Sequence, residues 1–408
     1  MPDSSLFFAE EKIIENATST FNNIDTISKD EVKNGYQSLF KSYKSLYKQF
    51  RRLIKLSDKQ QHKLNSLNEA LEVRNLFIKK IFGRYLSEDI VNTLLETPDG
   101  LELGGERRFV TIMMTDLRGF TALCETLSPE NVLRIINTYL EIMSEVVLKY
   151  NGTIDEIIGD GLFIIFGAPI QKSDDAIRSV ACAIEMQLAM INVNQRIQKM
   201  GFPELELGIG INTGEVVVGN IGSQFRTKYG LIGSNVNLTA RIESYSIGGQ
   251  ILISENTLKA CGNILQIKNT FEVLPKGLAK PINVYEINGI KTPYHLFLQK
   301  QKDDMFSLKT PLPILLFLIN GKHVCDNALR GVITKLNKTS CVIECGTRLD
   351  ILSNIKMSLF DDDNNPVTQD LYAKINKNFS DNSNDYTINF TSIPLDARDF
   401  FNDIMSKL

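Results

Sequence analysis

The sequence predicts an α+β protein with a long N-terminal helix, a central domain built around a sheet, and a C-terminal domain that is a small β-barrel or a β-sandwich. Apolar residues recur at alternating steps of three and four between Phe40 and Tyr85, which is the pattern of a heptad helix. A stretch rich in glycine and proline at 97–105 then marks a change to mixed strand-like and helical patterns. Beyond a polar linker at 291–304, the remaining residues are strand-like segments separated by turn residues.

The composition is that of an ordinary globular protein. The chain has 408 residues, a formal net charge of -3, 43% hydrophobic residues and 23% charged residues, which predicts a soluble protein of two or three domains. A nearly neutral charge argues against a dedicated nucleic-acid binder, because phosphate contacts require a basic excess.

The same sequence gives expectations about location. The longest apolar run, Leu312–Ile319, is far shorter than the roughly 20 residues that a membrane helix needs, so we expect no membrane span. The N-terminus has no basic start and no sustained apolar stretch, so it does not match a secretory signal. Six cysteines without a CxxC pair predict reduced, mostly buried thiols, and we expect a cytoplasmic protein.

A long helix is predicted for residues 28–86, after an N-terminal segment, 1–27, that contains no recognisable sensor domain. Ser28 and Glu31 have the spacing of a capping box, so the helix should begin there. The heptad seam favours a dimeric coiled coil, and polar seam residues cost stability while they fix the register. The polar seam residues are Ser57, Gln61, Asn68 and Asn75. A monomeric helix folded back on another domain stays open as an alternative, and residues 87–105 are interpreted as a linker.

The central domain is predicted to span residues 106–290. Its strands and helices alternate irregularly, which is typical of an α+β domain. Strands are expected at Arg108–Met114, Leu205–Asn212, Glu215–Asn220 and Gln250–Ile253, with a hairpin at Thr153–Phe166 that turns at Gly159 and Asp160. Helices are expected at about Ser128–Asn151, Asp174–Met200 and Ser234–Tyr245.

Two aspartates are the first candidates for a functional role. Asp116 follows a buried strand and precedes a glycine turn and a helix, an arrangement that presents backbone amides to an anion beside a carboxylate. Asp160 lies at the tip of a hairpin, between two glycines. Two carboxylates on neighbouring strand ends can hold divalent cations and, through them, a triphosphate. Because Asp and Gly are also the default residues of tight turns, a purely structural role for Asp160 stays open.

The third candidate is a pair of residues on one helix. Asn237 and Arg241 lie four residues apart, so their side chains project from the same helical face. A planar guanidinium suits the stabilisation of charge on a reacting phosphate. The alternative is that Asn237 solvates the helix start while Arg241 pairs at the surface with Glu243 or Glu185.

These three elements, in this order and with these spacings, resemble the class III adenylate and guanylate cyclase catalytic domain from Arg107 to Asn288. The resemblance implies a ferredoxin-like fold, a head-to-tail homodimer whose sites lie between the chains, and two divalent cations, Mg2+ or Mn2+, per site. The segments Phe77–Ser87 and Leu103–Arg108 also resemble the short helical transducer that precedes such domains in bacterial multidomain cyclases.

The resemblance implies a role for each candidate residue. Asp116 and Asp160 would hold the metal pair, with the carbonyl of Leu117 as a further ligand. Asn237 and Arg241 would orient the ribose and stabilise the pentavalent α-phosphate in the transition state. The backbone amides that would cradle phosphate are those of Arg118, Gly119, Phe120 and Thr121.

One expected phosphate contact departs from the family pattern. The family often has a basic residue at the position of Leu278, so this sequence leaves Lys276 or Lys280 to reach the phosphates. Either lysine would be displaced from the usual position, which predicts a slower enzyme or a different phosphate contact.

In the enzymes that this sequence resembles, two positions contact the purine base, and here they are Glu156 and Gly230. Adenylate-type members usually place Lys at the position of Glu156 and Asp or Thr at the position of Gly230. A carboxylate can accept from both N1–H and the 2-amino group of guanine but cannot donate to adenine N1, so Glu156 favours GTP over ATP. Gly230 departs from the Cys of eukaryotic guanylate cyclases. Glu156 as a merely solvated strand residue stays open.

Residues 305–408 resemble a PilZ domain in length, strand pattern and the ending at 390–401. The RxxxR turn and the DxSxxG strand that bind cyclic di-GMP are missing, and without arginines to clamp phosphate we do not expect this ligand. The domain is therefore interpreted as a divergent regulatory module or a contact for a protein partner.

The sequence thus predicts a homodimeric cyclase that converts GTP to 3',5'-cyclic GMP and pyrophosphate. An adenylate cyclase that makes cyclic AMP from ATP is the alternative within the class. A non-enzymatic, nucleotide-binding signalling scaffold is the competing class, favoured by the displaced lysine and the eroded PilZ motifs. The intact residues Asp116, Asp160, Asn237 and Arg241 favour the enzyme.

Overall fold

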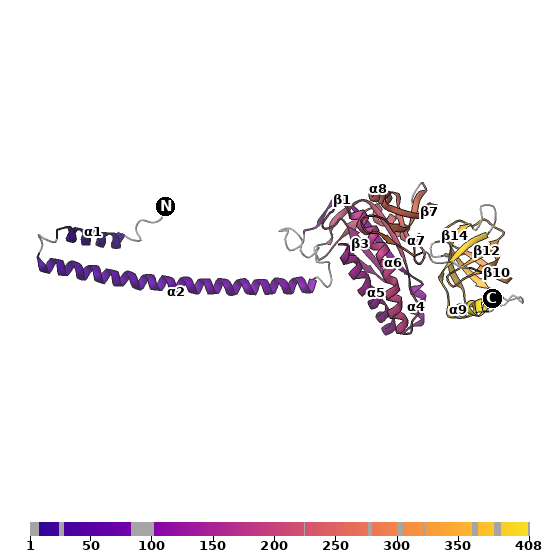
Figure 1. Cartoon of the computed structure of the whole chain (residues 1–408), viewed down its shortest axis with the longest axis horizontal. Helices are drawn as coiled ribbons and strands as arrows, with labels where there is room; N and C mark the ends of the chain where they lie inside the picture. Colours follow the sequence, from indigo (N-terminus) through magenta and orange to yellow (C-terminus); the bar gives the residue numbers. More distant parts are fainter. Residues whose placement is uncertain are drawn as a thin grey trace. The chain divides into compact units, whose positions relative to one another are not determined.

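The chain is described from a computed structural model (Figure 1). It describes residues 8–23, 28–82, 102–223, 225–275, 280–299, 305–320, 323–360, 366–378 and 385–406. Two units are distinguished, Met1–Ile81 and Phe82–Leu408. The mixed α+β architecture predicted from the sequence is confirmed.

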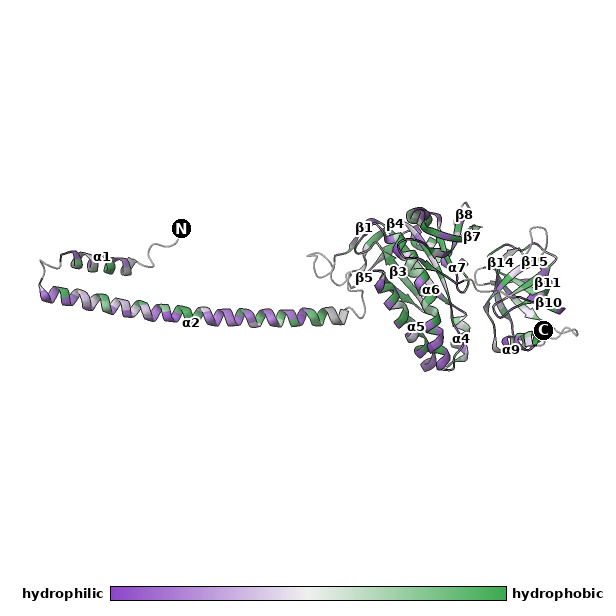
Figure 2. Cartoon of the chain, in the orientation of Figure 1, coloured by the Kyte–Doolittle hydropathy of each residue, from purple (hydrophilic) through white to green (hydrophobic). Residues whose placement is uncertain are grey.

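The first unit consists of helices α1 (Phe8–Asn22) and α2 (Lys29–Phe82). The capping box forms as predicted: the Glu31 N–H donates to Ser28 Oγ over 3.3 Å, and the Ser28 N–H donates to Glu31 Oε2 over 3.0 Å. Figure 2 shows hydrophobic positions recurring along α2 among hydrophilic ones. Tyr43 and Phe50 of the predicted seam are 66% and 62% exposed, so the residues that the structure describes leave these apolar seam positions largely uncovered.

The first part of the second unit, up to β9, is built on one mixed sheet with the strand order β2-β3-β1-β4-β6-β8-β7. Strand β5 pairs with β4 and strand β9 with β8. The strands are β1 (Gly104–Arg118), β2 (Thr153–Ile158), β3 (Gly161–Phe166), β4 (Glu206–Ser223), β5 (Arg226–Ile232), β6 (Ile251–Ser254), β7 (Leu265–Val273), β8 (Ile282–Ile290) and β9 (Leu296–Phe297). Strand β9 extends the sheet into the segment predicted as a linker.

Strand β4 corrects one expectation. The prediction divided 205–220 into two strands, because the sequence Asn212-Thr-Gly214 has the composition of a turn. In the structure β4 runs unbroken for 18 residues, since β1 pairs with it antiparallel along its whole length from Gly104 to Arg118. The continuous ladder satisfies the backbone groups that a turn would otherwise need to satisfy.

Helices cover both faces of the sheet. Four of them pack on one face, namely α4 (Phe120–Thr126), α5 (Pro129–Lys149), α6 (Asp175–Lys199) and α8 (Glu255–Cys261), and α7 (Ser234–Tyr245) packs on the other. The side chains of α5 and α6 form the largest core together with β1, β3 and β4. Among the described helices, α6 is long and apolar enough to cross a membrane by length and composition, and 61% of its most apolar window is buried in this core.

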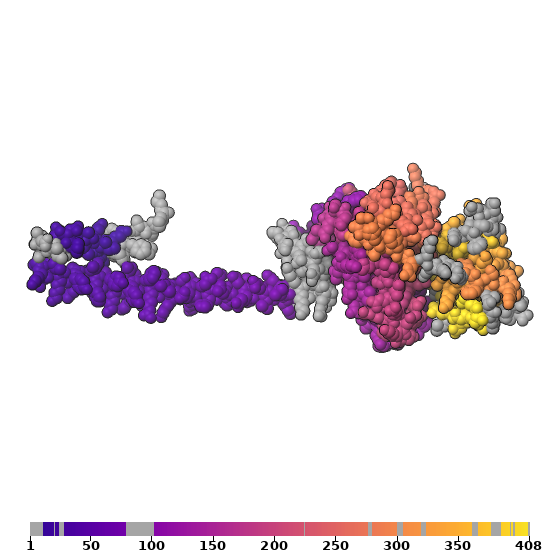
Figure 3. All heavy atoms as spheres, in the orientation of Figure 1, coloured from indigo at the N-terminus to yellow at the C-terminus, as the bar shows by residue number. Residues whose placement is uncertain are grey.

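The C-terminal part is a closed barrel with the strand order β10-β11-β12-β15-β14-β13, which confirms the predicted small β-barrel. Its elements are β10 (Phe306–Asn320), β11 (His323–Leu336), β12 (Ser340–Cys345), β13 (Asn354–Leu359), β14 (Leu371–Asn378), β15 (Asp385–Ser392) and helix α9 (Leu395–Ser406). Figure 3 shows the described atoms of the barrel strands in orange and of α9 in yellow. Phe401 of α9 stacks on Phe390 of β15 with ring centroids 5.4 Å apart, so the helix closes the barrel core.

Candidate functional site

Asp116 and Asp160, the two aspartates predicted to bind metal, lie at one edge of the sheet. The Leu117 N–H donates to Asp160 Oδ2 over 3.0 Å, which ties the tip of the β2–β3 hairpin to the end of β1. A side chain at Gly161 would place its Cβ 2.4 Å from the carbonyl oxygen of Thr115, so only glycine lets the hairpin approach this closely. The structure therefore brings together the two carboxylates that the sequence analysis singled out.

The charges of the two carboxylates interact. Burial raises the pKa of Asp160 above its ordinary value, and the neighbouring charge of Asp116 raises it further. Burial also raises the pKa of Asp116, where the guanidinium of Arg118 acts in the opposite direction. The two partly buried carboxylates repel each other, and a divalent cation bound between them would relieve that repulsion.

The donor set fits a magnesium-type ion. No group of three or more His, Cys, Asp or Glu side chains converges within the described part of the chain, so Asp116 and Asp160 form a pair without a third side-chain ligand of these types. Mg2+ is commonly held by one or two carboxylates together with waters and substrate phosphates. Leu117 directly follows Asp116 in the sequence. Its backbone carbonyl is a further hard oxygen donor of the kind that these ions prefer.

A tight turn follows the strand. Gly119 has a φ of 71°, in the left-handed region that favours glycine, and it allows β1 to lead directly into α4. Phe120 is buried and Thr121 is exposed, so the turn is anchored on its inner side. The backbone amides from Arg118 to Thr121, predicted to cradle phosphate, thus follow Asp116 directly.

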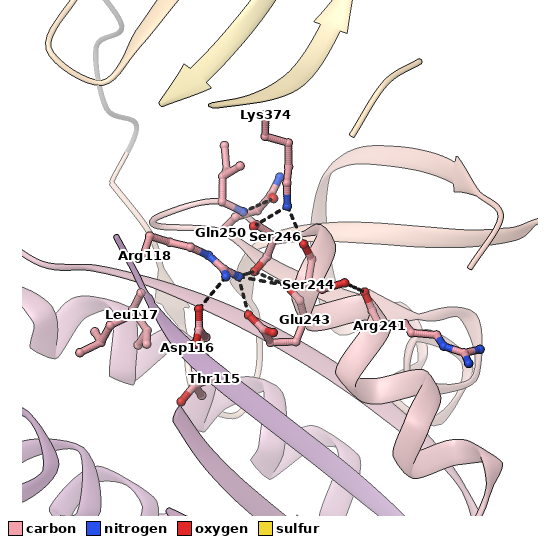
Figure 4. A network of polar contacts seen from close by, with 12 residues as sticks. Thr115, Asp116, Leu117, Arg118, Arg241, Glu243, Ser244, Ser246, Gln250 and Lys374 are labelled. Carbon is pink, nitrogen blue, oxygen red and sulfur yellow. Dashed lines mark hydrogen bonds and ion pairs between the residues drawn. The ribbon is translucent and has the colours of Figure 1, made fainter. Parts of the chain in front are cut away.

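The side chain of Arg118 forms a network that the sequence analysis missed (Figure 4). Its Nη1 donates to Asp116 Oδ2 over 2.8 Å, and its Nη2 donates to Ser246 Oγ over 2.7 Å and to the Glu243 carbonyl over 3.0 Å. Nη2 also forms an ion pair with the Glu243 carboxylate. Arg118 therefore joins the predicted metal aspartate on β1 to the C-terminal end of α7.

The predicted pair Asn237 and Arg241 lies on α7 as expected. The surface pairing considered as an alternative for Arg241 is not formed, because Glu243 pairs with Arg118 and Glu185 pairs with Lys149. The Arg241 side chain points away from the Arg118 network (Figure 4). No contact among the described residues joins Asn237 or Arg241 of this chain to Asp116 or Asp160.

The start of α7 is fixed on β4 by asparagines that carried no signal in the sequence. Asn212 Nδ2 donates to the backbone carbonyl and to the side-chain oxygen of Asn235, each over 3.1 Å. Asn235 Nδ2 in turn donates to the Glu215 carbonyl over 2.9 Å. Because α7 is anchored in this way, Asn237 and Arg241 have a defined position on the sheet.

The two residues predicted to read the base both have Asp155 as a neighbour, Glu156 along the chain and Gly230 in space. A Cβ at Gly230 would lie 3.8 Å from Oδ2 of Asp155, the neighbour of Glu156 in the chain. Lys228 Nζ lies 2.6 Å from Glu156 Oε2 and 3.2 Å from Asp155 Oδ2. Glu156 therefore pairs with a cation at the surface, and its part in base reading stays a prediction. Lys228 is a neighbour of Glu156 that the sequence analysis missed.

Asp155, Glu156 and Lys228 form a charged cluster in which one carboxylate is buried and the other is half-exposed. The side chain of Asp155 is 2% exposed, and burial raises its pKa while the charge of Lys228 opposes that rise. The register of β2 against β3 shifts between Ile154 and Glu156, and such a bulge re-aims side chains relative to a regular strand. The half-exposed Glu156 carboxylate is thereby left at the surface with a cation at its side.

The predicted phosphate lysines are not placed at the site. Lys276 lies outside the described residues. Lys280 is exposed just before β8, and its role toward phosphate stays a prediction.

Comparison with known proteins decides the family. Residues 105–289 match the sequence model of the adenylate and guanylate cyclase catalytic domain, a range that contains Asp116, Asp160, Asn237 and Arg241. These residues belong to the adenylate and guanylate cyclase family. The cyclase domain thus coincides with the mixed sheet and the helices that cover it.

Curated relatives show how far the similarity reaches. Adenylate cyclase 1 of Rhizobium meliloti (strain 1021) is 29% identical over 211 residues, which cover 51% of this chain and 32% of that protein. Adenylate cyclase of Anabaena cylindrica is 29% identical over 240 residues, covering 55% of this chain and 47% of that protein. The chain therefore spans less than half the length of these two relatives.

Solved structures carry names of both purine types. The crystal structure of the guanylyl cyclase Cya2 is 52% identical, covers 48% of this chain and 100% of that chain, and gives a TM-score of 0.48. The adenylyl cyclase CyaB from P. aeruginosa is 36% identical, covers 47% and 98%, and gives a TM-score of 0.45.

Proposed function

We propose that this chain is a guanylate cyclase that converts GTP to 3',5'-cyclic GMP and pyrophosphate. The observation that carries the proposal is the placement of Asp116 and Asp160 at one edge of the sheet, where their charges interact. The proposal rests further on the match of residues 105–289 to the cyclase family.

Asp116, Asp160 and the Leu117 carbonyl would hold the two divalent cations, Mg2+ or Mn2+. When bound, such ions make a hydroxyl more acidic and neutralise charge on transferring and leaving phosphates. The chain itself contributes the position of both carboxylates, which the Leu117 N–H and the glycine at 161 fix on the end of β1. The amides of residues 118–121 follow at once and would bind the phosphate oxygens.

Arg241 and Asn237 would act on the nucleotide from the other chain of a homodimer. Within one chain Arg241 points away from the network around Asp116 (Figure 4), which supports a site completed by a second copy. The exposed apolar seam of α2 supports dimerisation as well, because a coiled-coil partner would cover it. In that dimer Arg241 would stabilise charge on the α-phosphate, and Asn237 would orient the ribose.

Glu156 would select guanine. Its carboxylate accepts hydrogen bonds and has none to donate, which suits guanine N1–H and the 2-amino group. Lys228 Nζ, 2.6 Å from Glu156 Oε2, would hold the carboxylate in position. An adenylate cyclase remains the alternative, because named relatives include both types.

The remaining parts of the chain would regulate this activity. The PilZ-like barrel would serve as a regulatory module without cyclic di-GMP as ligand, and we place the protein in the cytoplasm. Both proposals follow from the sequence patterns described above.

Complementation between two inactive variants tests the shared site. Asp116→Ala and Arg241→Ala damage different halves of it, so each homodimer should form almost no cyclic product. In an equal mixture of chains half of the dimers are mixed, and each mixed dimer keeps one intact site, so about a quarter of the unaltered turnover should return. A mixture as inactive as its components would contradict a site shared between chains.

A further inference from the structure

The C-terminal barrel contacts the cyclase domain beside the Arg118 network. Lys374 of β14 donates from Nζ to the Ser244 carbonyl over 2.6 Å and to the Ser246 carbonyl over 3.2 Å (Figure 4). The side chain crosses from the barrel to the cyclase domain, and the residue is 2% exposed. An ammonium group is thus buried between the two domains at the end of α7.

Two further elements of the barrel take part in this contact. Leu352, which precedes β13, is buried in one cluster with Ile242 of α7 and Leu252 of β6. Burial and the charge of Glu204 raise the pKa of Glu206 on β4, and the charge of Arg398 on α9 acts in the opposite direction. The barrel therefore meets the cyclase domain through an apolar contact and through charges from separate elements.

Lys374 supplies a C-terminal cap to α7. The last carbonyls of a helix lack donors within the helix, and a cation at that end also interacts favourably with the helix dipole. Ser244 belongs to the last turn of α7, and Ser246 is its C-cap residue. The barrel therefore provides donors that the cyclase domain does not place on these two carbonyls itself.

Burying the ammonium group of Lys374 costs free energy of folding. This cost indicates that the cap does more than hold two domains together. Burial lowers the pKa of Lys374 to about 7, the charge of Arg118 lowers it as well, and Glu243 and Asp116 act in the opposite direction. A buried charge is weak evidence for stability, because well-packed apolar residues often serve as well or better. A role in positioning accounts for a lysine at this place.

The contacts lead from Lys374 to a candidate catalytic group in three steps. Lys374 binds the carbonyl of Ser246, and the Oγ of Ser246 accepts from Arg118. Arg118 then binds Asp116. The same helix, α7, carries Arg241 four residues before its end.

We propose that Lys374 is a positioning residue for the cyclase reaction, through which the barrel holds the end of α7 and the Arg118–Asp116 pair in place. The inference rests on the proposed function, because it takes Asp116 as a metal ligand. The barrel would then be part of the catalytic unit.

The test compares Lys374→Met with Lys338→Met in the full chain. Methionine keeps the length of the side chain and removes the donors, and Lys338 is an exposed lysine of the same barrel. Residues that orient metal ligands typically contribute about 10- to 100-fold to metal affinity or activity, so Lys374→Met should weaken Mn2+ binding about tenfold or more. Mn2+ binding is measured without nucleotide, from the electron paramagnetic resonance signal of free Mn2+, and turnover is measured in parallel.

Each outcome decides for or against the proposal. Weaker Mn2+ binding and lower turnover in Lys374→Met, with partial recovery in Lys374→Arg and no change in Lys338→Met, would support it. Unchanged Mn2+ binding in Lys374→Met would overturn it, even if turnover fell. If Lys374→Met does not fold, Leu352→Ala loosens the same contact, and unchanged Mn2+ binding there would equally overturn it.

A separate variant distinguishes failure of the proposed function. Asp116→Ala should abolish the Mn2+ binding that the comparison measures. If Asp116→Ala binds Mn2+ like the unaltered chain, the metal assignment has failed, and the positioning proposal falls with it. If Asp116→Ala loses Mn2+ and Lys374→Met does not, the positioning proposal alone has failed.

Discussion

Replacing Asp116 by Ala should lower cyclase turnover by about a thousandfold or more. Metal ions supply several kcal/mol of transition-state stabilisation, and about 1.4 kcal/mol corresponds to a tenfold change in rate. The substitution removes one of two carboxylates whose charges interact at this edge of the sheet. Formation of cyclic nucleotide with saturating Mn2+ is the measurement.

The fold should survive this substitution. Burial raises the pKa of Asp116, so the ionised side chain does not favour the folded state, and Arg118 keeps Glu243 and Ser246 as partners. Thermal unfolding followed by circular dichroism should therefore show a melting temperature close to that of the unaltered chain. Asp326→Ala, at an exposed position of the barrel, is the matched control and should keep full activity. Substantial turnover in Asp116→Ala would contradict the metal assignment.

The double variant Glu156→Lys, Gly230→Asp should move the preference from GTP toward ATP. A lysine at 156 can donate to adenine N1, and an aspartate at 230 can accept from the adenine amino group. Sites that bind a polar group of the substrate reject analogues that lack it, so we expect the ratio of kcat/KM for GTP to that for ATP to fall about a hundredfold or more.

The structure adds a condition to this experiment. Lys228 Nζ lies 2.6 Å from Glu156 Oε2, and a Cβ at Gly230 would lie 3.8 Å from Asp155 Oδ2. A single Glu156→Lys change would place two ammonium groups together, whereas the double variant restores a balance of two cations and two carboxylates. The double variant should therefore be more active than Glu156→Lys alone. Glu145→Lys, an exposed charge reversal on α5, should leave the preference unchanged.

An unchanged ratio would show that the base is read elsewhere. Kinetics with both nucleotides over a range of concentrations provide the ratio directly. Loss of all activity with a folded protein would be ambiguous for the single variant. Comparison with the double variant addresses that case, because the aspartate at 230 offsets the added ammonium group as well as accepting from adenine.

Local patterns in the sequence were sufficient to predict Asp116 and Asp160. Asp160 lies between two glycines, and Asp116 comes at a strand end three residues before Gly119, so both positions are recognisable along the chain. The face shared by Asn237 and Arg241 follows equally from helical spacing. The α+β class and the long α2 were predicted from periodicity together with capping and turn residues, and the same signals left the C-terminal domain as a small β-barrel or sandwich, of which the structure has the barrel.

Long-range side-chain contacts were beyond such patterns. Arg118, Glu243 and Lys374 come together from β1, α7 and β14, and no local spacing relates them. Lys228 likewise reaches Glu156 from a distant strand. The unbroken course of β4 was missed for a related reason, because its continuity depends on the paired strand β1.

The most direct test of the central proposal is to identify the product of the purified full chain. Equal concentrations of GTP and ATP are supplied with Mn2+ or Mg2+, and the cyclic nucleotides are quantified by mass spectrometry. We expect cyclic GMP in excess with either metal, because Glu156 accepts from guanine and cannot donate to adenine N1. Cyclic AMP in excess would contradict the assignment of Glu156, and no cyclic product with either metal would contradict the enzyme itself.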